Sequence, residues 1–437
     1  MLAALTKIFT GSEKFILTDE HKLSLDLLEN TTGNIFLTGK AGTGKTTLIS
    51  YFRSHSKKKI VILAPTGIAA LNIKGQTIHS FFKFPPRMID KNAIRRSSND
   101  RIYADIDCIV IDEISMVRAD LLDGIDMFLR LHGRDKNSPF GGVQMVFVGD
   151  MFQLPPVVRY EDMEIFGKFY DSPFFFSAKC MEDSIFHFIE LQTIFRQKEL
   201  EFVNILNKIR VGDVTAQTFE LINERHNPQG AGDKHIILCT TNKVAEGINE
   251  TKLAAINNEA FIYHAEIEGN FPTEERNIPA EIELKLKKDA RVLFVKNDSG
   301  GQWVNGSTGV VSSLSEDSIQ VKLDETGIAV EVHEDVWENI RYSLDPNTGE
   351  LKTEVLGKLR QYPLKLAWAI TIHKSQGMSF DKVCLDFSKS PFAHGQTYVA
   401  LSRCRTLQGL VVTRKLWPND VLIDERIIEF TNRLKRS

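Results

Sequence analysis

Short apolar runs alternate with amphipathic stretches through residues 1–190. Four of these runs are almost free of polar side chains, and they lie at 35–37, 60–63, 108–111 and 145–148. Fully apolar runs of this length are typical of parallel strands that are buried on both faces. The stretch 17–29 instead repeats its leucines at helical spacing, with Thr18 or Asp19 as a cap. The alternation predicts an α/β fold with a doubly wound parallel sheet.

The same pattern returns in the second half of the chain. Buried-strand runs lie at 236–239, 383–385 and 410–412. Between the first two of them, over 284–355, short strands follow one another at close spacing, and residues such as Asn305-Gly306 mark the turns. This pattern of short strands and turns predicts a small antiparallel barrel. We therefore expect a first domain over 1–190, a second over 191–283 and 356–437, and a barrel inserted into the second at 284–355.

Residues 81–105 fit neither pattern. Phe84-Pro85-Pro86 is followed by a polar stretch that contains several basic residues, namely Arg87, Lys91, Arg95, Arg96 and Arg101. We interpret this segment as a small excursion from the first domain.

Composition narrows the class of protein without naming it. Hydrophobic residues make up 42% of the chain and charged residues 25%, as in ordinary soluble proteins. No apolar run approaches the roughly 18 residues of a membrane span, and the N-terminal residues turn polar too soon for a signal peptide. The five cysteines have no metal-binding spacing and suggest a reduced state. The expected location is the cytoplasm, in association with the nucleoid in a bacterium.

Residues 39–46 carry the strongest chemical signal. They fit G-x-x-x-x-G-K-[ST], follow a predicted strand and begin a predicted helix, which is the context of a phosphate-binding loop. Lys45 should reach the β and γ phosphates, and the Thr46 hydroxyl should bind Mg²⁺. The alternative is a glycine-rich turn without a nucleotide. The residues expected to contact ATP here are Gly39, Ala41, Gly42, Thr43, Gly44, Lys45, Thr46 and Thr47.

Polar side chains follow two further apolar runs. Asp112 and Glu113 come directly after the run 108–111, where a carboxylate faces the nucleotide crevice of a parallel sheet. Asp112 is expected to hold Mg²⁺, and Glu113 to orient and deprotonate the attacking water. Gln153 follows the run 145–148 and can hydrogen-bond the γ-phosphate. The alternatives are a solvated acidic pair and a proline-stiffened surface loop.

Taken together, these motifs resemble those of a known family. The phosphate loop, DEISM at 112–116, GDMFQLPPV at 149–157, IHKSQG at 372–377 and YVALSRCR at 398–405 occur in the order of the helicase motifs of the Pif/RecD-like group of superfamily one. The similarity extends from about residue 17 to 410 and is closer to the Pif-type branch. It implies two RecA-like P-loop domains, an SH3-like barrel and a small wedge at 81–105.

The resemblance also implies roles for individual residues. Arg196 and Arg403 are similar to the two arginine fingers, and Gln376 and Gly377 should lie near the γ-phosphate. His21 stands where the group usually has a glutamine that reads the adenine edge, so selectivity for ATP does not follow from the motif. The residues similar to the DNA contacts are Pro65, Thr66, Gly67, Thr77, His79 and Phe81 in the first domain, and Asn242, Lys243, His373, Lys374 and Ser375 in the second.

The function implied is that of an ATP- and Mg²⁺-dependent helicase that moves 5′ to 3′ along single-stranded DNA. Its expected substrates are DNA forks, with G-quadruplexes or RNA–DNA hybrids as further candidates, in replication or repair; a monomer in solution and no membrane are expected. Because the net charge is -3, DNA must bind in a local cleft. The rival hypothesis is a P-loop NTPase switch or assembly factor that acts on a protein partner. A switch would need neither IHKSQG nor a second arginine-bearing domain.

Overall fold

The predicted parallel sheet of the first domain is present. The computed structural model describes residues 17–435, except for 86, 90–93, 95–100, 159, 183, 196–198, 231, 233, 274–277 and 345–350. Six strands lie in the order β3-β2-β4-β5-β1-β6, and neighbours run parallel. Their bounds are β1 (Asn34–Gly39), β2 (Ile60–Ala64), β3 (Gln76–Thr77), β4 (Cys108–Ile111), β5 (Gln144–Val148) and β6 (Phe186–Leu191).

The four apolar runs became the central strands of this sheet because both of their faces are covered. Every residue of β2, β4 and β5 is buried. Sequence patterning missed the two edge strands: β3 has only two residues, and β6 exposes part of one face. The helices of this domain are α1 (Asp19–Asn30), α2 (Lys45–His55), α3 (Gly67–Asn72), α4 (Ile78–Phe82), α5 (Arg101–Asp105), α6 (Ala119–His132) and α7 (Tyr160–Gly167).

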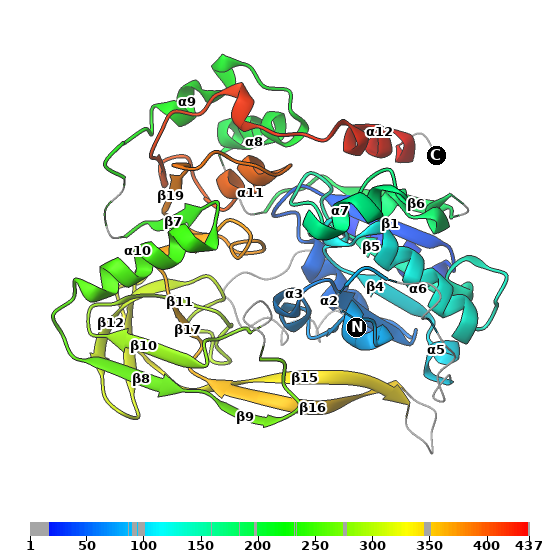
Figure 1. Cartoon of the computed structure of the whole chain (residues 1–437), viewed down its shortest axis with the longest axis horizontal. Helices are drawn as coiled ribbons and strands as arrows, with labels where there is room; N and C mark the ends of the chain where they lie inside the picture. The colour runs from blue at the N-terminus through cyan, green and yellow to red at the C-terminus, as the bar shows by residue number, and fades with distance from the viewer. Residues whose placement is uncertain are drawn as a thin grey trace.

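A second, smaller parallel sheet lies beside the first domain (Figure 1). Its strands follow the order β18-β7-β19-β20, and three of them coincide with the apolar runs of the second half. The fourth, β18, has three residues. The elements are β7 (Ile236–Cys239), β18 (Ala369–Thr371), β19 (Val383–Asp386), β20 (Leu410–Val412), α8 (Leu200–Val211), α9 (Glu220–Asn223), α10 (Asn242–Ala254) and α11 (Gln396–Ser402).

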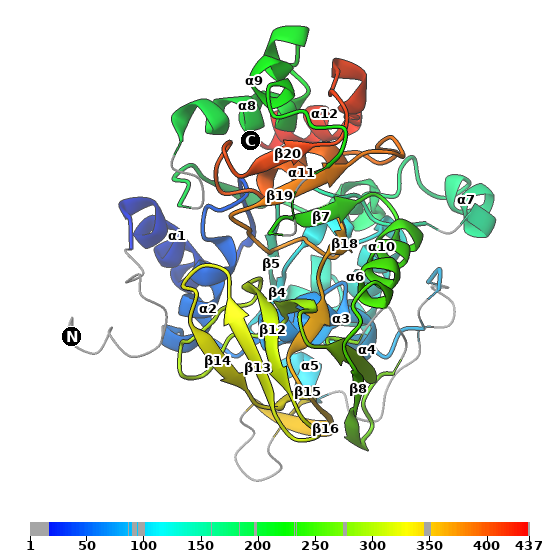
Figure 2. The ribbon, with the colours of Figure 1, turned by 90° about the vertical axis from the view of Figure 1, so that its left-hand side faces the viewer.

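Antiparallel strands occupy the predicted insertion and extend beyond both of its ends. A five-stranded sheet has the order β14-β13-β12-β11-β17, and its last strand lies after residue 355. Figure 2 shows β12, β13 and β14 side by side. The strands of this sheet are β11 (Arg291–Phe294), β12 (Thr308–Leu314), β13 (Ile319–Leu323), β14 (Ala329–Val332) and β17 (Leu364–Leu366), and a separate pair is β8 (Ala260–His264) with β10 (Glu283–Lys287).

A long hairpin projects from this region toward the first domain (Figure 1). It consists of β15 (Asp335–Leu344) and β16 (Leu351–Gln361), and β9 (Glu266–Gly269) pairs with its second strand. The strand β15 contacts β3, α4 and α5. The antiparallel region therefore touches both domains. Much of the predicted wedge lies outside the described residues, but α4 and α5 at its two ends contact this hairpin.

The C-terminal helix corrects the domain assignment. We expected residues 356–437 to belong to the second domain, yet α12 (Glu425–Leu434) packs on the first. Phe430 stacks on Phe176 with ring centroids 4.5 Å apart, and Ile427 is fully buried in the same cluster. Lys435 pairs with Glu190 of β6. The helix lies on the first domain because its apolar face is buried there against the first-domain sheet. None of the helices in the described part of the chain is long and apolar enough to cross a membrane.

Candidate functional site

The phosphate-binding loop connects β1 to α2, as its sequence predicts. Gly42 and Gly44 have φ angles of 81° and 80°, a left-handed conformation that suits glycine. Gly44 is also the N-cap of α2, so the first N–H groups of the helix point into the loop. The Lys45 ammonium donates hydrogen bonds to the carbonyls of Gly39 and Lys40, at 2.7 and 3.0 Å. Burial lowers the pKa of Lys45.

The acidic pair lies where β4 ends. The Glu113 N–H donates to the Asp112 carboxylate at 3.0 Å, and Glu113 has a positive φ of 52°. Asp112 is buried, and the nearby Thr46 side chain acts to lower the pKa of its carboxyl. Burial and the neighbouring Asp112 raise the pKa of Glu113 to about 7, and burial raises that of Asp112. A carboxyl with a pKa near 7 can act as a base at neutral pH.

Gln376 joins the two domains at this pair. Its side-chain amide donates to the Glu113 carboxylate at 3.1 Å and to the Gln153 side-chain oxygen at 3.3 Å. Glu113 and Gln153 follow β4 and β5 in the first domain, whereas Gln376 follows β18 in the second. Next to it, Gly377 adopts φ 81°. Three motifs that are far apart in sequence therefore meet at one point between the two domains.

The structure describes one of the two predicted arginine fingers. Arg196 lies outside the described residues. Arg403 is 1% exposed, and its guanidinium donates to carbonyls of Val399, Ser375 and Met378 and to the Ser402 hydroxyl. Its charge lowers the pKa of Glu113. Arg403 is therefore held inside the second domain, within electrostatic range of the predicted base.

His21 lies against the phosphate-binding loop. Its Nδ1 accepts a hydrogen bond from the Thr18 N–H, and the Thr18 hydroxyl accepts one from the His21 N–H, which together form a capping box at the start of α1. The ring stacks on Phe195, with centroids 5.8 Å apart. A side chain added at Gly44 would contact both rings. The capping role was not foreseen, although Thr18-x-x-His21 has its spacing.

Most predicted DNA contacts of the first domain follow the ends of β2 and β3. Pro65, Thr66 and Gly67 are partly exposed, and the Thr66 hydroxyl caps α3. Thr77 caps α4 in the same way, and burial lowers the pKa of His79 on that helix. Phe81 corrects the prediction, because its side chain is 4% exposed and packs between Phe82 and Tyr103. It belongs to the core and fixes α4 rather than facing DNA.

The predicted DNA contacts of the second domain also include both exposed and buried side chains. Asn242 and Lys243 begin α10 and are exposed, as is Lys374. His373 is partly buried, which lowers its pKa. Ser375 corrects the prediction: it is fully buried and its hydroxyl donates to the Ile372 carbonyl at 2.7 Å. Its hydroxyl therefore stabilises the turn that places Gln376.

Sequence reasoning missed three buried residues beside the phosphate-binding loop. Asp150 follows β5, Arg210 lies on α8 and Tyr398 on α11, and all three are at most 6% exposed. Asp150 and Tyr398 lie within motifs that the sequence singled out, but neither was assigned a role. Arg210 had no local signal, because a basic residue in the last turn of a helix is ordinary.

The fold and the site define a class of protein before any comparison is made. A phosphate-binding loop, a buried acidic pair and a second RecA-like core that contacts this pair are the elements of a two-domain P-loop ATPase.

Comparisons with known proteins identify the family. The model of the PIF1-like helicase family matches residues 17–220. The ATP-dependent DNA helicase Pif1 of Bdellovibrio bacteriovorus is 33% identical over 95% of this chain and 91% of its own length. The human ATP-dependent DNA helicase PIF1 is 33% identical over 92% of the chain and 62% of its own length. The chain belongs to the PIF1-like helicases, and it is an ATP-dependent DNA helicase.

Solved structures agree with this assignment. The crystal structure of Bacteroides sp Pif1 with ADP-AlF4 is 40% identical, covers 97% of this chain and 98% of that one, and has a TM-score of 0.88. The same relative bound to single-stranded DNA covers the same shares and has a TM-score of 0.70. The domain arrangement described here is thus more similar to the former. Membership of a helicase family also decides against the switch hypothesis.

Proposed function

We propose that this helicase moves 5′ to 3′ along single-stranded DNA and opens duplex DNA at forks, with ATP hydrolysed in the interdomain cleft. The observation that carries the proposal is the position of Gln376. It contacts both the predicted base and the predicted phosphate sensor from the opposite domain. Because those contacts cross the cleft, a change in the nucleotide would alter how the domains sit on each other.

In this proposal the first domain binds the nucleotide. Lys45 and the N–H groups of residues 42–47 bind the phosphates, Glu113 activates water, and Gln153 senses the γ-phosphate. Arg196 and Arg403 stabilise charge on the transferred phosphoryl group from the second domain. His21 and Phe195 form a stacked pair beside the loop that suits the flat face of a base.

Mg²⁺ fits the oxygen ligands that the chain offers. The Thr46 side chain lies close enough to Asp112 to lower the pKa of its carboxyl, so the chain offers a hydroxyl and a carboxylate oxygen in the same place. Protein sites for Mg²⁺ usually combine one or two such ligands with substrate phosphates. The ion would supply positive charge at the β and γ phosphates.

The DNA track is proposed to follow exposed polar groups on both domains. Thr66, Thr77 and His79 in the first, with Asn242, Lys243 and Lys374 in the second, offer hydroxyl, amide and cationic groups. Such groups hold phosphates without reading sequence. Bacteroides Pif1 has been solved bound to single-stranded DNA. A further Pif1 structure, also 40% identical to this chain, concerns DNA unwinding at forked double-stranded DNA by two coordinating helicases. Both support the proposed substrates.

The antiparallel region is proposed to guide the strand. Its five-stranded antiparallel sheet is proposed to be the SH3-like barrel that the resemblance implies, and its long hairpin touches the ends of the predicted wedge. The 5′-to-3′ polarity rests on the resemblance of the motifs and of this insertion to the Pif-type branch, since motors of opposite polarity share the same ATP chemistry.

Two partial duplexes test the proposal. One carries a 5′ single-stranded tail and the other a 3′ tail of the same length and sequence composition. We expect ATP-dependent unwinding of the 5′-tailed substrate, and single-stranded DNA should raise ATP turnover. Unwinding of only the 3′-tailed substrate would contradict the polarity. ATP turnover that is the same with and without single-stranded DNA would contradict the motor function itself.

A further inference from the structure

A buried ion pair joins the two domains beside the phosphate-binding loop. The Arg210 guanidinium donates to the Asp150 carboxylate with its closest nitrogen 2.9 Å from Oδ1. Asp150 belongs to the first domain and is fully buried, and Arg210 belongs to the second and is 6% exposed. Burial opposes ionisation of Asp150, but Arg210 and Lys45 hold its pKa below the ordinary value. The carboxylate is therefore charged and fully paired.

Tyr398 extends this contact to the loop itself. Its hydroxyl donates to Asp150 Oδ2 at 3.1 Å and accepts a hydrogen bond from the Ala41 N–H at 3.0 Å. Burial, then the charge of Asp150, raises the pKa of Tyr398, so the hydroxyl keeps its proton. The Tyr398 hydroxyl thus connects the second domain to the backbone of the phosphate-binding loop at Ala41.

The segment from Asp150 to Gln153 is held by the second domain along its whole length. Arg210 lies over the Phe152 ring, 4.4 Å from its centroid. His394 Nε2 lies 3.1 Å from the Met151 carbonyl. A side chain at Gly395 would collide with the carbonyl oxygens of Phe152 and Gln153. Gln153, the predicted phosphate sensor, is the last residue of this segment. Because of these contacts, the segment cannot shift unless the second domain moves with it.

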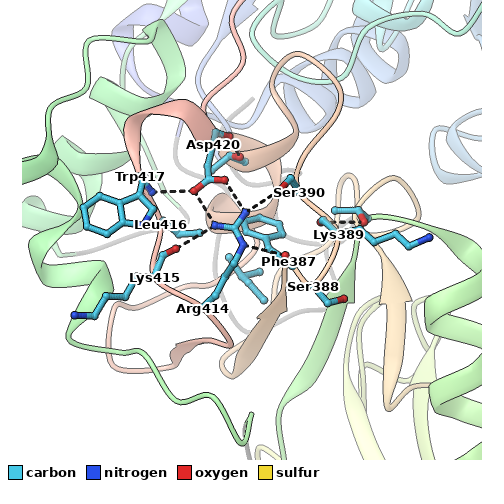
Figure 3. A network of polar contacts seen from close by, with 12 residues as sticks. Phe387, Ser388, Lys389, Ser390, Arg414, Lys415, Leu416, Trp417 and Asp420 are labelled. Atoms are coloured by element: carbon cyan, nitrogen blue, oxygen red, sulfur yellow. Dashed lines mark hydrogen bonds and ion pairs between the residues drawn. The ribbon is translucent and has the colours of Figure 1, made fainter.

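The helix that carries Tyr398 is itself fixed. The Thr397 hydroxyl donates to the Asp420 carbonyl, and Arg414 pairs with the Asp420 carboxylate at 2.6 Å. Arg414 also donates to the Phe387 carbonyl at the end of β19 (Figure 3). These contacts connect the helix of Tyr398 to the second-domain sheet. The sheet, rather than a local side-chain preference, therefore determines where Tyr398 lies.

We infer that Asp150, Arg210 and Tyr398 form an interdomain latch, which positions the phosphate-binding loop at Ala41 and the segment 150–153 against the second domain. They are positioning residues: none of them needs to touch the nucleotide. The latch favours the closed cleft in which Gln376 meets Glu113, and it links that closure to the nucleotide. The inference deepens the proposed motor function and rests on it for its effect on DNA-stimulated hydrolysis.

Tyr398→Phe tests the latch with the smallest change. It removes one hydroxyl and leaves the ring packing intact. Loss of the hydrogen bond to the buried Asp150 carboxylate, and of the one from the Ala41 N–H, should shift the equilibrium toward the open state and lower the DNA-stimulated kcat roughly tenfold. Equilibrium binding of a fluorescent ATP analogue should change less than the kcat, since the loop residues are unaltered. Tyr170→Phe is the matched control, because that buried hydroxyl donates to Asp123 within the first domain, at 2.9 Å.

A double variant separates a latch from a general loss of stability. Asp150→Asn keeps the shape of the side chain and removes its charge. If the two residues act through one latch, Tyr398→Phe combined with Asp150→Asn should lose no more kcat than the more damaging single variant. Additive losses would overturn the inference. So would parallel losses of kcat in Tyr398→Phe and Tyr170→Phe that follow their melting temperatures.

Hydrogen exchange tests the contact independently of DNA. Without nucleotide or DNA, the Ala41 amide in Tyr398→Phe should exchange faster than in the unaltered helicase, and in Tyr170→Phe it should not. Unchanged exchange at Ala41 would overturn the latch. If DNA fails to stimulate the unaltered helicase, the motor function is wrong, and the exchange result still decides the latch.

Discussion

The side-chain amide of Gln376 donates a hydrogen bond to the Glu113 carboxylate at 3.1 Å, from one RecA-like domain to the other. A buried carboxylate with a pKa raised to about 7 benefits from a donor that stabilises its charged form. The hydrogen bond therefore assists the predicted base only while the domains are together. In the proposed mechanism, these two residues couple ATP hydrolysis to the relative position of the domains.

Glu113→Gln should separate ATP binding from ATP hydrolysis. The amide cannot take a proton from water, so turnover should fall by about 10²–10⁴-fold. The phosphate-binding loop is untouched, so ATP should still bind. Single-turnover hydrolysis and equilibrium nucleotide binding measure the two steps. Normal hydrolysis with weakened binding would contradict the role assigned to Glu113.

Lys45→Ala should abolish hydrolysis for a different reason. The ammonium group is the one cation of the phosphate-binding loop motif that is placed to meet the β and γ phosphates. We expect loss of DNA-stimulated ATPase activity, with an unchanged far-ultraviolet circular dichroism spectrum. Lys58→Ala is not a suitable control, because the Lys58 ammonium donates hydrogen bonds to three oxygen atoms of the first domain. Lys57→Ala is a suitable control, because Lys57 is exposed. Retained activity in Lys45→Ala would overturn the assignment of the nucleotide site.

The two predicted arginine fingers should respond differently to substitution. Arg403→Ala leaves the carbonyls of Val399 and Met378 without their buried donor, so it should lower both ATP turnover and the melting temperature. Arg196→Ala should lower turnover while ATP still binds. Arg405→Ala, which breaks a partly exposed pair with Asp381, is the control and should change little. Wild-type turnover in Arg403→Ala would exclude it from the site.

Acidification should reduce the contribution of His394 to the stability of the fold. The Asp424 N–H donates to Nδ1, so Nε2 carries the proton that faces the Met151 carbonyl. Burial lowers the pKa of His394 from 6.5, so the folded protein keeps the ring neutral while the unfolded chain takes up a proton. This contribution to stability is complete above the unfolded pKa and is lost as pH falls from 6.5 toward the folded pKa.

Thermal unfolding between pH 7.5 and 5.5 tests this contribution. The melting temperature should fall on acidification, and it should fall less in His394→Gln, whose amide can still donate to Met151 but does not titrate. The control is His264→Gln, at a side chain that is 67% exposed. An identical pH dependence in the His394 and His264 variants would contradict the prediction.

The long hairpin should matter more for unwinding than for hydrolysis. Replacing residues 341–354 with an Asn-Gly turn keeps Trp337 and Leu359, which anchor the hairpin in a small core. All residues assigned to ATP lie outside it, so hydrolysis should persist while unwinding of a forked duplex falls. Glu325→Ala, at the exposed turn between β13 and β14, is the control. Equal losses of both activities would mean that the hairpin is a structural support of the first domain.

The sequence by itself determined the local elements. Strands β1, β2, β4 and β5 were predictable because a strand covered on both faces must be apolar throughout. The phosphate-binding loop was predictable because its glycines are fixed by backbone geometry and its lysine by phosphate chemistry. Asp112, Glu113 and Gln153 could be placed near it because each follows a strand of the same parallel sheet. These inferences need only neighbours in the chain.

The tertiary structure decided everything that depends on distant neighbours. Phe81 and Ser375 lie in motifs of the DNA track, yet they are buried, and only packing could show this. α12 follows the second domain in sequence but covers the first, since an amphipathic helix does not encode which apolar surface it meets. The pairing of Arg210 with Asp150 spans 60 residues, and that of Tyr398 with Ala41 spans 357. Because no local pattern specifies such partners, the contacts between the two domains emerged only from the folded chain.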